Sequence, residues 1–303
     1  MQLTNSSLIA IVGPTGAGKS ALALTLAEKF DGEIVNFDSV QVYRGLNIGS
    51  AKTPMDERRG IPHHLLDVVG PAEDFTAGEF ARRAEACLRD IAGRAKLPVL
   101  VGGTGFYLRS LLDGLSPAPG RNEALRERLS QLVIRRPFAL HRFLRRLDKD
   151  AANRIHPNDH QKLIRAIELA ITVSSPAPRK SLEGFRTLKI GLNPDRTALY
   201  ERLNRRSAAM FELGLLEETR TLISAGVAAD ARGLQSLGYR QAVAILQGRM
   251  SLEDAIADVQ TKTRQYAKRQ MTWFRRERDV DWLNGFGLEM QTAAISLVLQ
   301  FVV

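Results

Sequence analysis

The sequence predicts an α/β protein in which a parallel β-sheet core carries a helical insertion and continues into C-terminal helices. Three short apolar runs, residues 8–12, 33–37 and 98–101, are typical of buried strands. Apolar residues recur at helical spacing over 20–30, 76–94 and 106–112, so we predict helices that follow or separate these strands. Strands that alternate with helices in this way form parallel sheets with right-handed crossovers.

The pattern changes in the middle of the chain. Two Pro-rich stretches, residues 116–120 and 174–178, bracket a helical block. A strand-like run at 187–192 then precedes further helices to about residue 278, and an apolar C-terminal stretch predicts a helix or strand packed on the core. We therefore predict a core domain formed by residues 1–115 and 181–303, and an insertion domain at 116–180.

Charge is concentrated in that insertion. The chain of 303 residues has a formal net charge of +10, and residues 116–180 contain 14 Lys and Arg against 6 Asp and Glu, a net charge of +8. A basic block of this kind indicates a polyanionic partner such as nucleic acid, rather than a charge that only aids solubility. The insertion is therefore the expected docking surface.

Composition excludes several other classes. The single cysteine, Cys87, cannot form an intrachain disulfide and is expected to be a small buried side chain. No apolar run reaches the ~18 residues needed to span a bilayer, and the first residues lack the pattern of a signal peptide. We expect a cytoplasmic, monomeric protein with no membrane partner.

A phosphate-binding loop follows the first predicted strand. The pattern G-x-x-x-x-G-K-S lies between that strand and a helix, which is the context that a P-loop requires. Glycines let backbone amides converge on phosphate oxygens, while the helix N-terminus and Lys19 add positive potential. Ser20 can ligate Mg²⁺ or bond a phosphate oxygen. The predicted phosphate-binding residues of the loop are Gly13, Pro14, Thr15, Gly16, Ala17, Gly18, Lys19 and Ser20, and the motif does not determine which phosphate compound binds. The core is thus predicted to be of the P-loop NTPase-like type.

Two polar residues follow the other predicted strands. Asp38 comes after the second strand, where it is a candidate Mg²⁺ ligand or general base, or else a turn or helix-capping residue. Thr104 follows the third strand between glycines, with helix capping as its alternative role. Since parallel strands end at one edge of a sheet, both are expected near the P-loop. For the adjacent His63 and His64 we expect a structural role, because neighbouring side chains point in different directions.

Taken together, these motifs resemble one family. From about residue 8 to 282 the chain is similar to the bacterial type of the tRNA dimethylallyltransferases, also called tRNA isopentenyltransferases or the IPP transferase family. A P-loop alone is shared by many unrelated proteins, but the other elements in this order are specific. The segments that carry the resemblance are GPTGAGKS, NFDSVQVYRGLNIGSAK, GIPHHLLDVV, GGTGFYLRSLL, DAANRIHPNDHQKLIRAIEL, LGYRQA and TRQYAKRQMTWFRRE.

The resemblance implies transfer of a dimethylallyl group from dimethylallyl diphosphate to the N6 amine of the adenine immediately 3′ of the anticodon in tRNA. It implies that Asp38 is the general base, that Lys19 and Thr104 are also catalytic, and that Mg²⁺ lies beside Ser20. Arg240 is implied as a further cation on the diphosphate. The insertion is implied to grip the anticodon stem-loop. The residues implied to contact tRNA are Asp38, Ser39, Val40, Gln41, Thr104, Arg126, Gln161, Lys162, Leu163, Ile164 and Arg165.

The sequence departs from the family pattern at one position, and it leaves three competing functions open. Gln235 stands where the family pattern leads us to expect a basic residue, and no zinc-finger extension of the eukaryotic kind follows residue 282. The same loop, Lys19 and Asp38 would serve a P-loop kinase of a nucleoside or small metabolite. A nucleic-acid-binding ATPase and an enzyme that prenylates free adenine nucleotides are also compatible with a P-loop core. The basic insertion favours the tRNA-modifying enzyme over the kinase and the free-nucleotide enzyme.

Overall fold

The computed structural model describes residues 6–116, 120–136, 138–172 and 180–302. They form two compact units: a core unit, Met1–Asp113 with Leu182–Val303, and an insertion unit, Gly114–Ser181. Of the two predicted Pro-rich stretches, residues 117–119 and 174–178 lie outside the described residues. Each unit has its own apolar core.

A parallel sheet forms the centre of the core unit, which confirms the predicted fold class. In the described part of the chain it has six strands in the order β3-β2-β4-β1-β5-β6, and every pair is parallel. The edge strands β3 and β6 were not predicted, because they are short and lack an apolar run. The strands are β1 (Ser6–Val12), β2 (Gly32–Asn36), β3 (His63–His64), β4 (Leu97–Val101), β5 (Phe185–Leu192) and β6 (Val280–Leu283).

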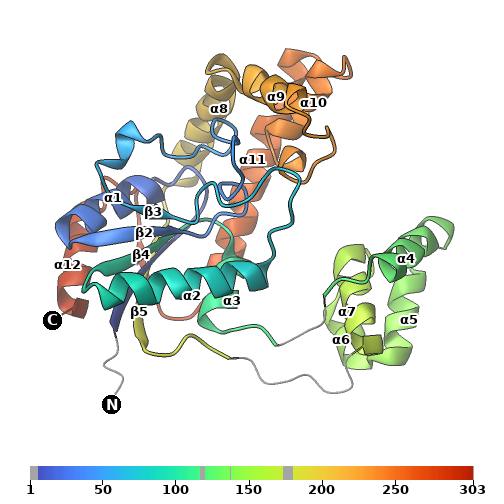
Figure 1. Ribbon diagram of the computed structural model, residues 1–303, viewed down its shortest axis with the longest axis horizontal. Helices are drawn as coiled ribbons and strands as arrows, with labels where there is room; N and C mark the ends of the chain where they lie inside the picture. The colour runs from blue at the N-terminus through green and yellow to red at the C-terminus, as the bar shows by residue number, and fades with distance from the viewer. Residues whose placement is uncertain (1–5, 117–119, 137, 173–179, 303) are drawn as a thin grey trace. The chain divides into compact units, whose positions relative to one another are not determined.

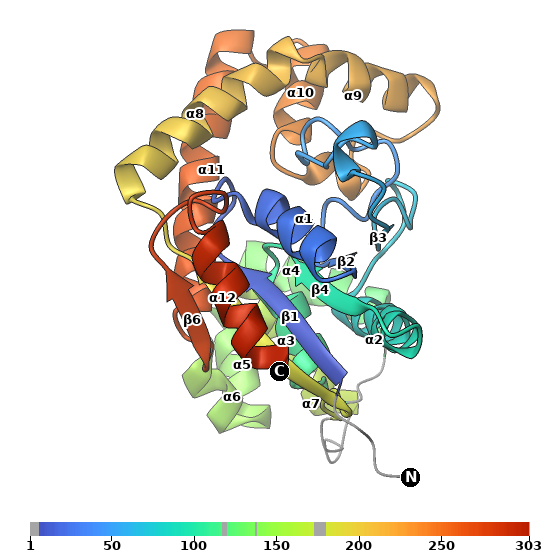
Figure 2. The ribbon, with the colours of Figure 1, turned by 90° about the vertical axis from the view of Figure 1, so that its left-hand side faces the viewer.

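Helices cover both faces of this sheet (Figure 2). Helices α1 (Lys19–Lys29) and α12 (Gln291–Val302) pack on one face, and α2 (Ala77–Gly93) and α3 (Gly105–Leu112) on the other. Successive side chains of β1 alternate between the faces, as a strand buried on both sides requires. Ile9 and Ile11 belong to the apolar cluster with α1 and α12, and Leu8 and Ala10 to the cluster with α2 and α3.

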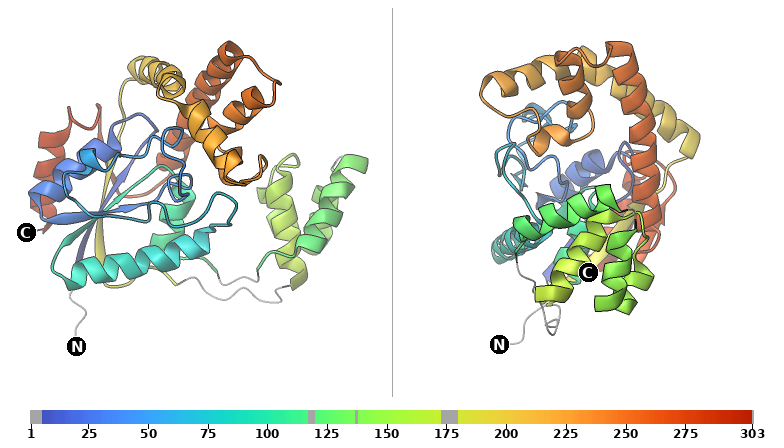
Figure 3. Two further views of the ribbon diagram at one scale, coloured as in Figure 1. Left: turned by 45° about the horizontal axis from the view of Figure 1, so that its top comes forward. Right: turned by 90° about the vertical axis from the view of Figure 1, so that its right-hand side faces the viewer.

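The remaining α-helices of the core unit follow β5, whereas the short 3₁₀ helix η1 (Asp56–Arg58) lies between β2 and β3. These α-helices are α8 (Arg196–Glu212), α9 (Leu215–Ser224), α10 (Tyr239–Leu246) and the long α11 (Leu252–Phe274), with the short 3₁₀ helix η2 (Gly233–Gln235) in a loop. Helix α11 packs against α8, α10 and α3 (Figure 3). Among the described residues, no helix combines the length and apolar character needed to cross a bilayer.

In its described residues the insertion unit, drawn in green in Figure 1, has four helices. They are α4 (Glu123–Arg135), α5 (Ala139–Leu147), α6 (Lys149–Arg154) and α7 (His160–Thr172). Asn122 and Asp148 cap the N-termini of α4 and α6 through side-chain oxygens. Leu140, Leu144 and Leu163 are fully buried or nearly so, and their cluster forms the core of the unit.

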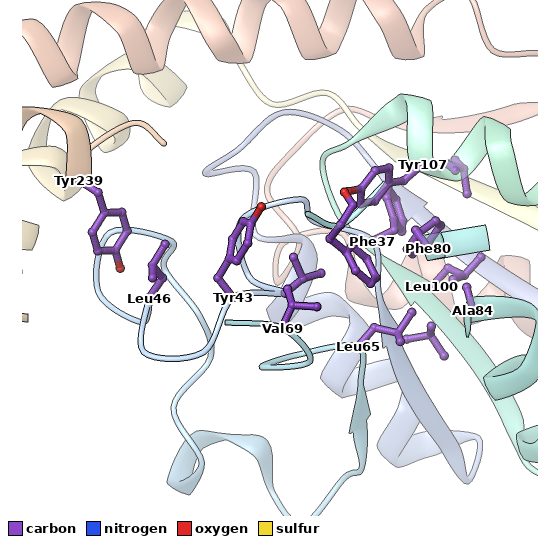
Figure 4. Close-up of a cluster of buried hydrophobic side chains, with 14 of the residues drawn as sticks. Phe37, Tyr43, Leu46, Leu65, Val69, Phe80, Ala84, Leu100, Tyr107 and Tyr239 are labelled. Carbon is purple, nitrogen blue, oxygen red and sulfur yellow. The ribbon is translucent and has the colours of Figure 1, made fainter. Parts of the chain in front are cut away.

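An extended apolar cluster connects the sheet with the loop that follows β2 (Figure 4). Its labelled side chains run from Phe80 and Leu100 beside the sheet to Leu46 and Tyr239 at the other end. The Tyr239 hydroxyl donates to Glu218 and accepts from the amide of Gly49 at 3.0 Å. The loop after β2 is therefore fixed by α9 and α10 as well as by the sheet.

Polar side chains join the edge of the sheet to α2. His64 Nε2 lies 2.7 Å from Glu33, whose side chain is only 3% exposed, and Arg94 donates to both carboxylate oxygens of Glu33. Hydrogen bonds from Arg94 lower the pKa of Glu33 from its ordinary 4.5 to about 2. Burial raises this pKa, whereas the hydrogen bond with His64 lowers it further. This contact supports the structural role expected for His64.

Glu33→Gln should destabilise the protein by about 2 kcal/mol at pH 7. This loss is smaller than that expected from breaking a fully buried ion pair, because the side chain of Arg94 is 42% exposed. Since the pKa of Glu33 is lowered on folding, the stabilisation is present above pH 4.5 and is lost as pH falls toward 2. Urea unfolding at several pH values should show the difference from wild type shrinking below pH 4.5. Asp31→Asn, at an exposed pair with Lys96, is the control and should change stability far less; a pH-independent loss for Glu33→Gln would contradict the assignment.

Candidate active site

The predicted site residues follow three neighbouring strands. Strands β2, β4 and β1 are adjacent in the sheet, and their carboxyl ends lead to Asp38, to Thr104 and to the P-loop. In parallel sheets, ligands bind in the crevice outside these ends. Helix α11 passes the same edge, since Gln270 is hydrogen-bonded to the turns after β1 and β4.

The residue that precedes helix α1 is a glycine in the left-handed conformation. Gly18 has φ of 86°, and a Cβ there would also lie 2.9 Å from the amide nitrogen of Gly287. Helix α1 begins at Lys19, so the first amides of the helix, including that of Ser20, have no intrahelical partner. This end of the helix attracts anions.

Lys19 lies in a partly buried position within the loop. Its Nζ donates to the Pro14 carbonyl at 2.8 Å. Burial lowers the pKa of Lys19 to about 8, and Arg206 lowers it further, while Asp38 opposes both. Binding of a phosphate anion would stabilise the charged form of Lys19.

Two of the predicted phosphate-binding amides are used within the protein. The amide of Thr15 donates to Oε1 of Gln270 at 2.7 Å, and that of Ala17 donates to the Pro14 carbonyl at 3.2 Å. The amides of Thr15 and Ala17 therefore help to shape the loop. The Thr15 hydroxyl accepts from Arg206 at 2.8 Å.

Asp38 uses one of its two carboxylate oxygens to form a turn. Its Oδ1 accepts from the amides of Val40 at 2.8 Å and Gln41 at 3.3 Å, as in a turn-forming aspartate. Its Oδ2 has no hydrogen-bond donor in the part of the chain that the structure describes. One oxygen holds the turn while the other remains available to a ligand.

Thr104 occupies the N-cap position of α3 without capping it through its side chain. Its hydroxyl instead accepts from the amide of Ser39 at 3.0 Å and donates to the Ser39 hydroxyl at 3.2 Å. Burial raises the pKa of Tyr266, which neighbours Thr104 and Gln270, so the phenol stays protonated. The two hydrogen bonds between Thr104 and Ser39 connect the turn after β4 with the residue next to Asp38.

A pocket of about 480 Å³ opens beside these residues. Its basic side chains are Arg206, Arg240, Lys262 and Arg269, and Asp38 is its only acidic one among the described residues. Val40, Met210, Leu237 and Val259 give it an apolar wall. The pocket combines cations for an anionic group with an apolar surface and one carboxylate.

Part of the predicted site lines this pocket, whereas Lys19 and Thr104 are not among its lining residues. Asp38, Ser39, Val40 and Arg240 line the pocket, as does Thr15 of the P-loop. Gln41 does not line it.

The side chain of Gln41 supports a loop. Its Nε2 donates to the carbonyls of Ser50 at 3.0 Å and Ala51 at 3.3 Å. The structure therefore gives Gln41 a role in holding the loop that contributes Gly49 and Ser50 to the pocket.

Sequence reasoning missed three basic residues of the pocket. Arg206 lies on α8 and has a buried Nε without a hydrogen-bond partner in the described residues. Lys262 and Arg269 lie on α11. No local motif marks Arg206 as a residue of the site.

The predicted tRNA contacts of the insertion unit fall into three groups. Leu163 is fully buried and Ile164 is 8% exposed, so the expectation that their side chains contact RNA is corrected: they form the core of the unit. Arg126 and Arg165 donate to the buried Glu168 at 3.0 and 2.5 Å.

Gln161 and Lys162 of the insertion unit are exposed at the start of α7. The Lys162 ammonium group donates to Asp159 at 2.6 Å, and Gln161 is available to a partner.

The site also fits Mg²⁺ of the kind that binds mainly through a substrate. Among the described residues, no group of three or more His, Cys, Asp or Glu could hold a metal on its own. Mg²⁺ commonly keeps several waters and binds through substrate phosphates and one or two protein oxygens. The exposed Ser20 hydroxyl, next to the phosphate-binding end of α1, is suited to that arrangement.

The fold and the pocket together define a P-loop protein with a basic pocket, suited to a phosphorylated ligand, beside a carboxylate. Family models give a narrower assignment: one described as IPP transferase matches residues 41–277, and one described as isopentenyl transferase matches residues 6–69. The chain belongs to the IPP transferase family.

Similar proteins span nearly the same length. The chain is 52% identical to a tRNA dimethylallyltransferase of Solibacter usitatus, over 97% of this chain and 99% of that protein. It is 55% identical to one of Koribacter versatilis, over 94% and 95%. A crystal structure of a tRNA isopentenylpyrophosphate transferase from Bacillus halodurans has a TM-score of 0.72 and 36% identity, covering 98% of both chains. A eukaryotic dimethylallyltransferase acting on tRNA has a TM-score of 0.81 and 29% identity, covering 98% of this chain and 80% of that one.

Proposed function

We propose that this chain is a tRNA dimethylallyltransferase. It transfers the dimethylallyl group of dimethylallyl diphosphate to the N6 amine of the adenine immediately 3′ of the anticodon, with release of diphosphate. The observation that carries the proposal is the placement of Asp38 and four basic side chains around one pocket beside the P-loop. Membership of the IPP transferase family, and the printed names of its relatives, support this choice of reaction.

The P-loop side of the pocket stabilises the leaving group. The new bond forms between N6 and C1 of the allyl group, while the bond from C1 to the diphosphate oxygen breaks and its electron pair stays on diphosphate. Lys19, the free amides at the start of α1 and Arg206 would hold this developing negative charge, and Arg240 would add a further cation. Preorganised charges of this kind act most strongly where charge develops in the transition state.

Asp38 activates the nucleophile. The lone pair of the adenine amine is delocalised into the ring, so the amine is a weak nucleophile. Oδ2 of Asp38 would take the proton from N6 as the new bond forms, while Oδ1 keeps the turn in place. The adenine must leave its stack to reach the pocket, as in other base-modifying enzymes.

The other polar residues would orient the reactants. Thr104, held by Ser39, would bond the bridging oxygen of the diphosphate or orient the RNA at the reacting carbon. The apolar wall with Val40 and Met210 suits the allyl chain. Mg²⁺, held by Ser20 and the diphosphate, would supply charge neutralisation of the leaving group when bound.

A single assay tests the proposal. The protein is incubated with labelled dimethylallyl diphosphate, ATP and a tRNA that has adenine 3′ of the anticodon. Label should enter the tRNA at that adenine and diphosphate should be released. Phosphate transfer from ATP without labelling of tRNA would support the kinase instead, and labelling of free adenine nucleotides alone would support the nucleotide prenyltransferase.

The insertion unit would bind the anticodon stem-loop through its exposed cations. Replacing Arg142, Arg145 and Arg146 of α5 by Ala should weaken tRNA binding by about tenfold or more, because each is exposed and, within the described residues, faces no buried partner of the kind that holds Arg126. The slope of log K against log salt should fall by about 0.7–0.9 for each phosphate that the variant no longer neutralises. Fluorescence anisotropy at several salt concentrations measures both.

The control for this prediction is a triple alanine variant of Arg82, Arg83 and Arg89 on α2. It removes the same charge from the chain, but these arginines are engaged with Glu79 and Glu85 of their own helix. An equal loss of affinity in both variants would show that only net charge matters and would contradict a docking role for α5.

A further inference from the structure

One buried amide connects the two turns that carry the catalytic residues. Gln270 on α11 is 4% exposed. Its Oε1 accepts from the amide of Thr15 at 2.7 Å, and its Nε2 donates to the carbonyl of Gly103 at 2.9 Å. Both polar ends of the side chain are therefore satisfied, each by the backbone of a different turn.

The turn after β4 is built to let α11 approach. A Cβ at Gly103 would collide with Nε2 of Gln270, and one at Gly105 would collide with the indole ring of Trp273. Tyr266, Gln270 and Trp273 lie four and three residues apart, so they share a face of α11. The two glycines bring the backbone of this turn directly against that face.

Each turn held by Gln270 leads to a group that the reaction needs. Thr15 is part of the loop that ends at Lys19, where the leaving group is bound. Gly103 precedes Thr104, whose hydroxyl is bonded to the amide of Ser39, next to Asp38. In addition to the pairing of β1, β4 and β2, one side chain therefore links the leaving-group site to the base.

We propose that Gln270 is a positioning residue that keeps the P-loop and the β4–α3 turn at the spacing required for allyl transfer. The inference rests on the proposed function for its activity readout. Gln270 does not contact the reacting atoms; it acts through the Thr15 amide and the Gly103 carbonyl. A displacement of about 1 Å between reacting groups can cost about 100-fold in rate, so the loss of this link should appear mainly in kcat.

The chemistry of the link permits a sharp test. The position needs an acceptor for the Thr15 amide and a donor for the Gly103 carbonyl. A carboxylate supplies only the acceptor and repels the carbonyl, whereas a protonated carboxyl group supplies both. The activity of Gln270→Glu relative to wild type should therefore depend on pH. That of Gln270→Met, whose side chain has neither a donor nor an acceptor for this link, should not.

The experiment measures kcat and KM for both substrates between pH 6 and 8, with each value divided by that of wild type at the same pH. Gln270→Glu should lower kcat by about 100-fold at pH 8, with a smaller change in KM. Because the position is buried, the pKa of the introduced carboxyl group should be raised, so the variant should recover at least tenfold relative to wild type at pH 6. Gln270→Met should be impaired to a similar degree at every pH. Melting temperatures identify any variant that fails to fold.

Gln260→Glu is the matched control. This residue is also on α11, and its amide also donates to a backbone carbonyl, that of Asn204 at 3.2 Å on α8, away from the two turns. The charge change is the same, and kcat should stay close to wild type across the pH range.

Two results would overturn the inference. The first is a kcat near that of wild type for both Gln270 variants. The second is a loss in Gln270→Glu that does not recover at low pH although the variant is folded. If wild type itself transfers no allyl group, the proposed function fails separately, and affinity for inorganic diphosphate then provides the test: it should be weakened in Gln270→Glu at pH 8 and restored relative to wild type at pH 6.

Discussion

Asp38→Asn should lower kcat for allyl transfer by about 100-fold or more while leaving the affinity for dimethylallyl diphosphate within about threefold of wild type. The asparagine keeps Oδ1, which accepts from the amides of Val40 and Gln41, so the turn after β2 is retained. It replaces Oδ2 by a group that cannot accept a proton from the adenine amine. Single-turnover kinetics with preformed enzyme–tRNA complex measures the chemical step directly.

Asp38→Ala separates the base from the turn. Alanine removes both oxygens, so it should lose the turn as well as the base, and binding of tRNA should weaken in addition to the slower chemistry. If Asp38→Asn transfers at the wild-type rate, Asp38 is not the base, and its role is confined to the turn.

Lys19→Met should lower kcat by about 100- to 1,000-fold and also weaken diphosphate binding, because it removes a full charge from the leaving-group site. The Nζ of Lys19 donates to the Pro14 carbonyl, and burial, with the Arg206 guanidinium adding to it, lowers the pKa of the ammonium group. The pKa of about 8 means that the cation is present below pH 8 and is lost as pH rises through that value. Affinity for inorganic diphosphate should therefore fall above pH 8 in wild type.

Lys19→Arg is the control for this prediction. Arginine stays protonated far above pH 8, so the fall in affinity above pH 8 should disappear in Lys19→Arg, whatever its absolute affinity. Isothermal titration calorimetry with inorganic diphosphate between pH 6.5 and 9.5 gives these curves. An unchanged fall above pH 8 in Lys19→Arg and Lys19→Met would assign it to a different group.

Local sequence was sufficient for several parts of the site. The P-loop consists of consecutive residues whose spacing alone determines the turn and the helix start at Lys19. Asp38 and Thr104 were expected beside it because each directly follows an apolar strand, and parallel strands end at the same edge. The structure places those strands next to one another in the order β2-β4-β1.

Other parts depended on contacts that no local pattern contains. Helical periodicity predicts that α8 and α11 each bury one face, but it does not say which elements those faces meet. Leu163 and Ile164 illustrate the same limit, since a motif that contains them suggested RNA contact whereas packing places both in the core of the insertion unit. Gln41 likewise belongs to a motif but supports a loop.

By itself, the sequence determined the α/β class, the phosphate-binding loop and the residues that follow the central strands, because these depend on interactions between near neighbours in the chain. Only the tertiary structure decided that Arg206 meets Thr15 across 191 residues, and that Gln270 meets the same residue across 255. Such contacts depend on how the helices pack against the sheet edge, which is set by the shape and burial of many side chains together. The P-loop can therefore be predicted from eight consecutive residues, whereas the groups that position it can be identified only in the folded chain.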